Sequence, residues 1–239
     1  MKKISFAFFV IFLVLFIVSC ASNRKGISED PSPANIKTVT KTTASSEHED
    51  AVAFYIQGAK LLDEGKYEEA EQFFWEAVAI DEDYIDALDY LGIVLRRLGK
   101  TNEAISVLKK SIERDSINPV PYNSLIMAYL DKGDFRNALK ICDDAIENIP
   151  YSGDGFYHKG AVLMKQKKYK DAITNLETAL DMYKGTDESQ YDETLFSLGY
   201  CYYNMKKWDE AIGYFEKAQK AFPDDETLQM LIDDAMKSR

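Results

Sequence analysis

The pattern of hydrophobic and polar positions divides the chain into three zones. Residues 4–18 form a nearly unbroken apolar run. Residues from 21 to about 50 are rich in Ser, Thr, Asn and Lys, contain two prolines and show no amphipathic pattern, so we expect a disordered tether there. From Ala51 onward, apolar and small residues return at a fixed interval, which predicts a helical repeat array. Residues 226–239 carry Leu228, Leu231 and Ala235 at helical spacing and predict one further helix.

The repeat interval is 34 residues. One series of alanines occurs at Ala70, Ala104, Ala138, Ala172 and Ala211, spaced by 34, 34, 34 and 39. A second series, of glycines, keeps the same distances at Gly58, Gly92, Gly160 and Gly199, and Ile126 stands where the third glycine is missing. Two series with one period indicate five copies of a structural unit.

Bulky residues recur in register with the alanines. An aromatic residue often lies three positions before the alanine, at Tyr67, Phe135, Tyr169 and Trp208. A bulky residue lies four positions after it, at Phe74, Leu108, Leu176 and Phe215, with Cys142 in the third unit. Small residues at the glycine and alanine positions predict two helices of a hairpin in close contact, and a single hairpin leaves an apolar face that only a neighbour can bury.

This combination resembles the tetratricopeptide-repeat (TPR) family, with Pro150 and Pro223 at the helix-ending position. The resemblance implies an all-α fold, a right-handed α-solenoid of five hairpins at 51–84, 85–118, 119–152, 153–186 and 192–225, plus a capping helix at 226–239. We expect Asp187–Tyr191 to extend a loop. Glycines mark the first three turns within hairpins, whereas Lys167 and Lys206 replace them in the last two, where we expect slightly altered turns.

The N-terminal zone resembles a bacterial lipoprotein signal. Lys2 and Lys3 precede an apolar run of about 15 residues, which is shorter than the roughly 20 residues that a membrane-spanning helix needs. Residues 17–20, Ile-Val-Ser-Cys, resemble a lipobox, which implies a signal peptide at 1–19, lipidation of Cys20 and a tether at 20–50. The alternative is an uncleaved anchor helix. Acyl chains on Cys20 would hold the chain on a membrane of the bacterial cell envelope, with an outer membrane favoured where one exists because Ala21 is not acidic.

The charge balance excludes one class of partner. Removing residues 1–19 takes away two lysines and no acid, which leaves 27 basic and 40 acidic residues and a net charge of −13. Such a polyanion repels nucleic acid, whereas the resemblance to the TPR family implies a protein partner.

The first helix of each TPR hairpin lines a concave groove, so the resemblance assigns partner-binding residues by register. We assign these residues as the groove: Tyr55, Leu62, Ile93, Arg96, Arg97, Asn123, Met127, Leu130, Tyr157, Met164, Phe196, Tyr200, Tyr203 and Asn204. Aromatic residues and methionines in such a groove favour an apolar or helical segment. The alternative is that several of them are buried by neighbouring parts of the chain. Family members that clamp a terminal carboxylate use Lys and Asn at set groove positions. In this chain Tyr55, Ala59 and Asp89 stand there, which disfavours that class of ligand.

The sequence shows no catalytic constellation, and we expect no enzyme, no cofactor and no metal. His48 falls in the tether, and the neighbours of His158, Tyr157 and Lys159, form no constellation of acid, base and nucleophile with it. Cys142 and Cys201 fall in different hairpins, too far apart to form a disulfide, so we expect both to be reduced. The leading hypothesis is therefore an envelope-anchored scaffold or adaptor that binds a partner peptide or helix. The alternative is an accessory subunit of a solute transporter that binds a small apolar ligand.

Overall fold

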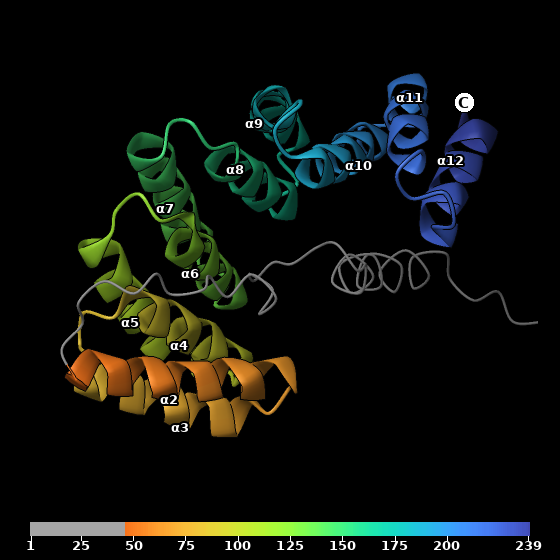
Figure 1. The fold of residues 1–239 in the computed structure, drawn as a ribbon. Helices are drawn as coiled ribbons and strands as arrows, with labels where there is room; N and C mark the ends of the chain where they lie inside the picture. Colours follow the sequence, from red (N-terminus) through yellow and green to blue (C-terminus); the bar gives the residue numbers. More distant parts are fainter. Residues whose placement is uncertain (1–45) are drawn as a thin grey trace, which may run out of the picture. The chain divides into compact units, whose positions relative to one another are not determined.

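The computed structural model describes residues 46–239, and all regular secondary structure in this range is α-helical (Figure 1). The range divides after Met182 into two compact units. The first unit contains α2 (Ser46–Asp63), α3 (Tyr67–Ile80), α4 (Ile85–Arg97), α5 (Thr101–Arg114), α6 (Pro119–Asp131), α7 (Phe135–Asn148), α8 (Asp154–Lys165) and nearly all of α9 (Tyr169–Tyr183). The second unit contains α10 (Glu188–Asn204), α11 (Trp208–Gln219) and α12 (Glu226–Ser238). The signal, Cys20 and most of the predicted tether lie outside the described residues.

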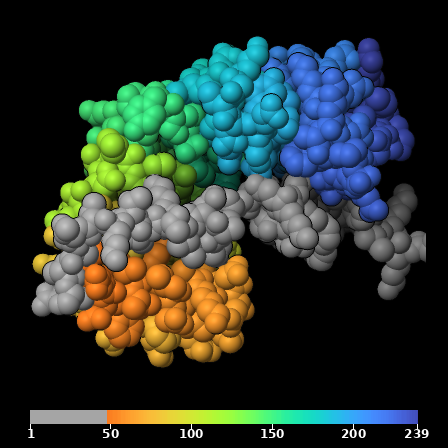
Figure 2. Space-filling view, in the orientation of Figure 1, coloured from red at the N-terminus to blue at the C-terminus, as the bar shows by residue number. Residues whose placement is uncertain are grey.

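Consecutive helices pack as hairpins, which confirms the predicted fold class. Contacts join α2 to α3, α4 to α5, α6 to α7 and α10 to α11. In the first unit, the first helices of neighbouring hairpins also pack on one another, from α2 through α4 and α6 to α8. Buried apolar side chains from successive hairpins of the first unit form shared clusters. Figure 2 shows the outer surface of these hairpins, coloured from orange to green along the chain. The predicted capping helix is α12, which packs on α11.

Two element boundaries differ from the sequence expectation. Helix α2 begins at Ser46 rather than near Ala51, so His48 is helical and its Nδ1 lies 2.7 Å from Asp81 Oδ2. The residues expected to extend a loop before the fifth repeat instead lengthen its first helix. Asp187 caps α10 by accepting a hydrogen bond from the amide of Gln190 at 3.0 Å, and the helix starts at once. Among the described residues, no helix is both long and apolar enough to cross a membrane.

The same turn joins the two helices of all five hairpins. In the first, the amide of Gly65 donates to the Leu62 carbonyl at 3.0 Å and the amide of Lys66 donates to the Leu61 carbonyl at 2.9 Å; equivalent pairs occur in the other four. The central residue is left-handed, with φ of +74° at Gly65 but also +60° at Lys167 and +58° at Lys206. The two lysines therefore do not alter the turn, because its paired hydrogen bonds hold the backbone in the conformation that glycine adopts freely.

The repeated glycines make room for the bulky residue of the second helix. A Cβ added at Gly58 would lie 2.9 Å from the Phe74 ring, and one at Gly199 would lie 2.5 Å from the Phe215 ring. Gly92 meets Leu108 and Gly160 meets Leu176 in the same way. The nearest atoms to each of these glycines belong to the bulky residue of the second helix, and at Gly160 the Ala172 carbonyl oxygen lies within 3.4 Å of the added Cβ as well.

The third hairpin reverses this arrangement of sizes. Ile126 replaces the glycine on α6 and Cys142 replaces the bulky residue on α7, and both side chains are fully buried in one apolar cluster. In the other hairpins the first helix carries the small residue and the second helix carries the bulky one. Here the sizes are exchanged, and the pair still fills the space between the helices, as close packing requires.

Candidate partner-binding face

We define the first-helix face as the side chains that α2, α4, α6 and α8 carry at the repeat positions assigned to the groove. Two rows cross these four helices at intervals of 34 residues. The first row is Leu62, Arg96, Leu130 and Met164, all partly exposed. The second row is Asp63, Arg97, Asp131 and Lys165, all exposed, and its charge alternates in sign from helix to helix. A largely apolar row beside a row of alternating charge suits a segment that is both apolar and mixed in charge.

Arg96 links the two rows. Its Nη1 lies 3.2 Å from Asp131 Oδ2, which connects α4 to α6, and its side chain is only 7% exposed. The guanidinium of Arg96 is thus held in place by the fold, and Arg97 beside it is exposed.

The structure corrects the assignment at the N-terminal end of the face. Tyr55 and Ile93 are each 2% exposed and belong to the apolar core, so neither is accessible to a partner. The Tyr55 ring is surrounded by Phe74, Tyr84 and Tyr90, with ring centroids 5.3 to 5.9 Å away. Burial raises the pKa of Tyr55 well above its usual range. These aromatic residues fill the space between the first two hairpins, and this packing was not evident from the sequence register.

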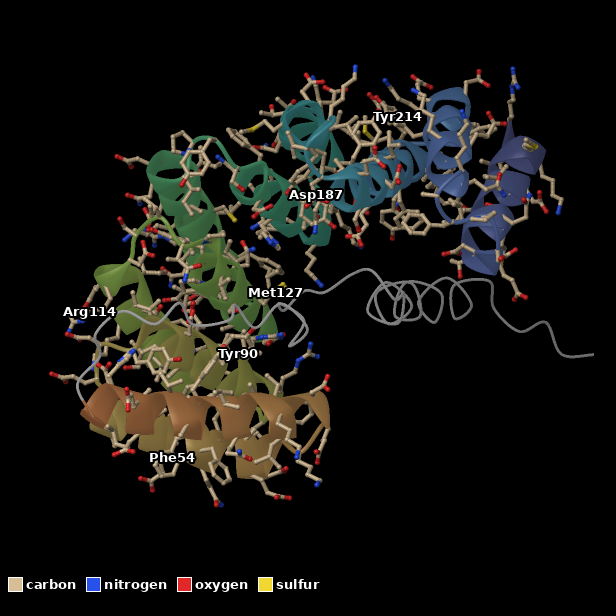
Figure 3. The ribbon with its side chains drawn as sticks, in the orientation of Figure 1. Phe54, Tyr90, Arg114, Met127, Asp187 and Tyr214 are labelled. Carbon is tan, nitrogen blue, oxygen red and sulfur yellow. The ribbon has the colours of Figure 1, made fainter. Side chains whose placement is uncertain are left out.

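The equivalent positions on α6 and α8 are open. Asn123 and Tyr157 occupy the repeat position of Tyr55, and Met127 occupies that of Ile93; all three are partly exposed, and Figure 3 labels Met127 on α6. Together with Leu130 and Met164 they form the accessible apolar part of the first-helix face. The partner-binding candidates in the first unit therefore concentrate on α6 and α8.

Asp89 is also internal, although its register placed it in the groove. It is 2% exposed; Ser111 Oγ donates to one carboxylate oxygen at 2.5 Å and Asn118 Nδ2 donates to the other at 2.6 Å. Asn118 in turn caps α6 by accepting from the amide of Val120 at 3.1 Å. Desolvation raises the pKa of Asp89 to about 7, and the two hydrogen bonds oppose that shift. Asp89 therefore joins α4 and α5 to the start of α6.

In the second unit, the predicted residues divide between packing and exposure. The Tyr203 hydroxyl donates to Asp234 on α12, and its ring meets Trp208 edge-on at 5.3 Å, so Tyr203 fastens the capping helix. Phe196 packs against Phe215 at 5.8 Å. Tyr200 is half-buried with its pKa raised by desolvation, and Asn204 is exposed.

The histidine and cysteine side chains among the described residues are wholly or partly buried. His158 is partly buried, its ring centroid lies 5.5 Å from that of Tyr157, and burial lowers its pKa. Cys142 and Cys201 are buried and free, and burial raises the pKa of each thiol to about 12, which disfavours the reactive thiolate. Within residues 46–239, no group of three or more His, Cys, Asp or Glu side chains could hold a metal ion.

Family models match three segments of the helical region. Tetratricopeptide-repeat models match residues 86–116 and 153–224, and a PPR repeat model matches residues 120–148. These matches support the tetratricopeptide-repeat family over the second, fourth and fifth of the repeats that the 34-residue period marks.

Among curated relatives, photosystem I assembly protein Ycf3 of Cuscuta obtusiflora is 28% identical over 142 residues, covering 58% of this chain and 83% of that protein. The uncharacterized protein ycf37 of Guillardia theta is 29% identical over 75 residues, covering 31% of this chain and 42% of its own. The human protein O-mannosyl-transferase TMTC1 is 25% identical over 72% of this chain but only 19% of its own length. The chain thus spans less than half the length of several relatives that it matches.

Solved structures share the fold. TTC0263, a thermophilic TPR protein of Thermus thermophilus, superimposes with a TM-score of 0.61 at 23% identity, over 78% of this chain and 99% of that one. YrrB, described as a TPR protein with an unusual peptide-binding site, superimposes with a TM-score of 0.54 at 19% identity, over 79% of this chain and 93% of that one. At these identities the likeness establishes an α-solenoid of TPR hairpins.

Proposed function

We propose that this chain is a non-enzymatic adaptor, lipid-anchored to a membrane of a bacterial cell envelope, that holds an apolar segment of a protein partner on its first-helix face. The repeat models and structural neighbours support a protein-interaction scaffold, and YrrB is described as a peptide-binding TPR protein. The observation that carries the proposal is the accessible apolar group on α6 and α8, made of Met127, Leu130, Tyr157 and Met164, beside a row of alternating charges.

The physical basis of binding is burial of this apolar group. Large apolar side chains left partly in water gain free energy when a partner covers them. Methionine adapts its shape to different partner surfaces, and the alternating charges fix the register of the bound segment. The four helices form one packed unit, so the face is largely preformed and binding needs little ordering of the chain.

The membrane anchor in this proposal rests on the signal-like residues before Cys20. Replacing Cys20 with Ser should release the protein from the membrane fraction and prevent incorporation of a labelled fatty acid. Continued labelling of the Cys20→Ser variant would show that the fatty acid is attached at another residue.

The binding face is tested with a photo-crosslinking amino acid placed at Met127. Crosslinking in cells should capture a defined partner, and Met164→Asp on the neighbouring helix should abolish the capture. The matched control is Ile117→Asp, an exposed apolar residue in the loop before α6, 57% exposed, which should leave the capture intact. Tyr203 is a poor target, because its replacement would also loosen α12. Equal capture in the Met164→Asp and Ile117→Asp variants would refute the first-helix face as the binding site.

A further inference from the structure

A cleft of about 270 Å³ opens between the second helices α5 and α7, with α6 as its floor. Tyr122, Leu125 and Tyr129 form the floor, and each is almost fully buried. The first-helix face lies on other side chains of α6, so this cleft is a separate surface. Its volume suits a few side chains from one face of a helix rather than a whole helix.

Both walls of the cleft carry a lysine followed one turn later by an acid. The pairs are Lys109 with Glu113 on α5, and Lys140 with Asp144 on α7. Residues four apart share one helix face, so both lysines lie toward one end of the cleft and both acids toward the other. Within the described residues, none of the four charges takes part in an ion pair, although Arg114 on α5 pairs with Asp83 at 2.5 Å.

Helix α12 presents the complementary pattern. Its buried stripe packs on α11, while the opposite face exposes Asp233, Lys237 and two methionines, Met230 at 45% and Met236 at 51%. The acid precedes the lysine by one turn, which is the cleft's spacing in the opposite order. Asp233 accepts a hydrogen bond from Gln229 at 2.9 Å, and neither charge has an ion-pair partner in the part of the chain that the structure describes.

We propose that α12 of a second copy of this chain docks in the α5–α7 cleft, parallel to both walls. Asp233 then meets Lys109 and Lys140, and Lys237 meets Glu113 and Asp144. In this direction Met230 lies at the lysine end of the cleft, near Tyr129, whose ring centroid lies 5.9 Å from the Lys109 ammonium.

The consequence is head-to-tail association. The cleft and α12 are different surfaces. A pair of copies therefore still has one open cleft and one undocked α12, and assemblies can grow beyond a dimer. The interface is small, so the association is weak and concentration-dependent. Much of it is electrostatic and exposed, so it weakens with rising salt.

The test uses two charge-reversed variants of the full chain in a nonionic, density-matched detergent. The helix variant carries Asp233→Lys and Lys237→Asp. The cleft variant carries Lys109→Glu, Lys140→Glu, Glu113→Lys and Asp144→Lys. Both keep the net charge, and all the changed side chains are at least partly exposed. The control reverses Lys170 and Asp171, two exposed neighbours on α9.

Sedimentation velocity over a concentration series gives the result. The wild-type chain and the control should associate, and each variant alone should associate at least about tenfold more weakly, since several weak ion pairs become repulsions. An equimolar mixture of the two variants should recover the association, because each reversed helix then meets a reversed cleft. A wild-type chain that stays monomeric, or a mixture that stays dissociated while circular dichroism shows both variants folded, would overturn the proposal.

Discussion

Asp89 gives the folded chain a pH dependence that can be calculated. Its carboxyl is buried between α4, α5 and the start of α6, and its pKa is raised from 3.8 to about 7, chiefly by desolvation, with Asp86 and Asp115 adding to the shift. A raised pKa means that the folded state binds the proton more tightly than the unfolded chain. The stability that this proton confers is therefore complete below pH 3.8 and is lost as the pH rises to about 7.

The magnitude follows from the size of the shift. A difference of about three pKa units corresponds to at most about 4 kcal/mol in the free energy of unfolding, at about 1.4 kcal/mol per unit. Between pH 5 and pH 8 the free energy of unfolding of the wild-type chain should fall by about 2 to 3 kcal/mol through this group. Asn at position 89 imitates the protonated carboxyl, because it can accept from Asn118 and donate to Ser111, so it should remove this loss.

The assay is urea unfolding followed by circular dichroism at pH 5, 6, 7 and 8, for the wild-type chain and Asp89→Asn. The free energy of unfolding of the variant minus that of the wild type should rise across this range by the amount above. Asp181→Asn, an exposed change on α9, serves as the control and should show no such trend. A flat difference for Asp89→Asn would mean that Asp89 ionises normally in the folded chain, and it would refute the raised pKa.

Two further substitutions test the packing of the repeats. Lys167→Gly should stabilise the fold by about 1 kcal/mol, because glycine adopts a positive φ without the steric cost that lysine bears; Lys168→Gly, one residue later, is the control, and thermal unfolding is the measurement. Ile126→Gly should destabilise by about 2 to 4 kcal/mol through the cavity that it leaves. Cys142→Leu in the same chain should recover part of this loss, and strictly additive effects in denaturant unfolding would refute the reciprocal packing of positions 126 and 142.

Most of the fold could be predicted from the period alone. Alanines and glycines 34 residues apart are sufficient to place five hairpins, because the close contacts between helices demand small residues at fixed positions. The boundaries were harder to predict. One long-range contact, His48 with Asp81, marks the first turns of α2, and one local contact, Asp187 with Gln190, marks the start of α10. Neither contact leaves a periodic signal.

The candidate site was predicted less well than the fold. Register identifies the helix face of a residue, but not whether the next hairpin covers it. Tyr55 and Met127 both lie on that face, yet the rings of Tyr84 and Tyr90 enclose Tyr55 while Met127 remains accessible. Asp89 shows the same limit, because its partners, Ser111 and Asn118, lie 22 and 29 residues away and only the folded structure brings them to the carboxyl.

The exchange of sizes between Ile126 and Cys142 has a consequence for how such arrays can diverge. A duplicated hairpin of the glycine type needs two substitutions to reach the state of the third hairpin. Whichever substitution comes first leaves either a clash or a void. Grafting α6 onto α5 or α9 of another repeat would bring Ile126 against a leucine that already fills that space. The third hairpin is therefore interchangeable with its neighbours only as a whole, which makes the two-helix unit, rather than the single helix, the smallest piece that recombination can move.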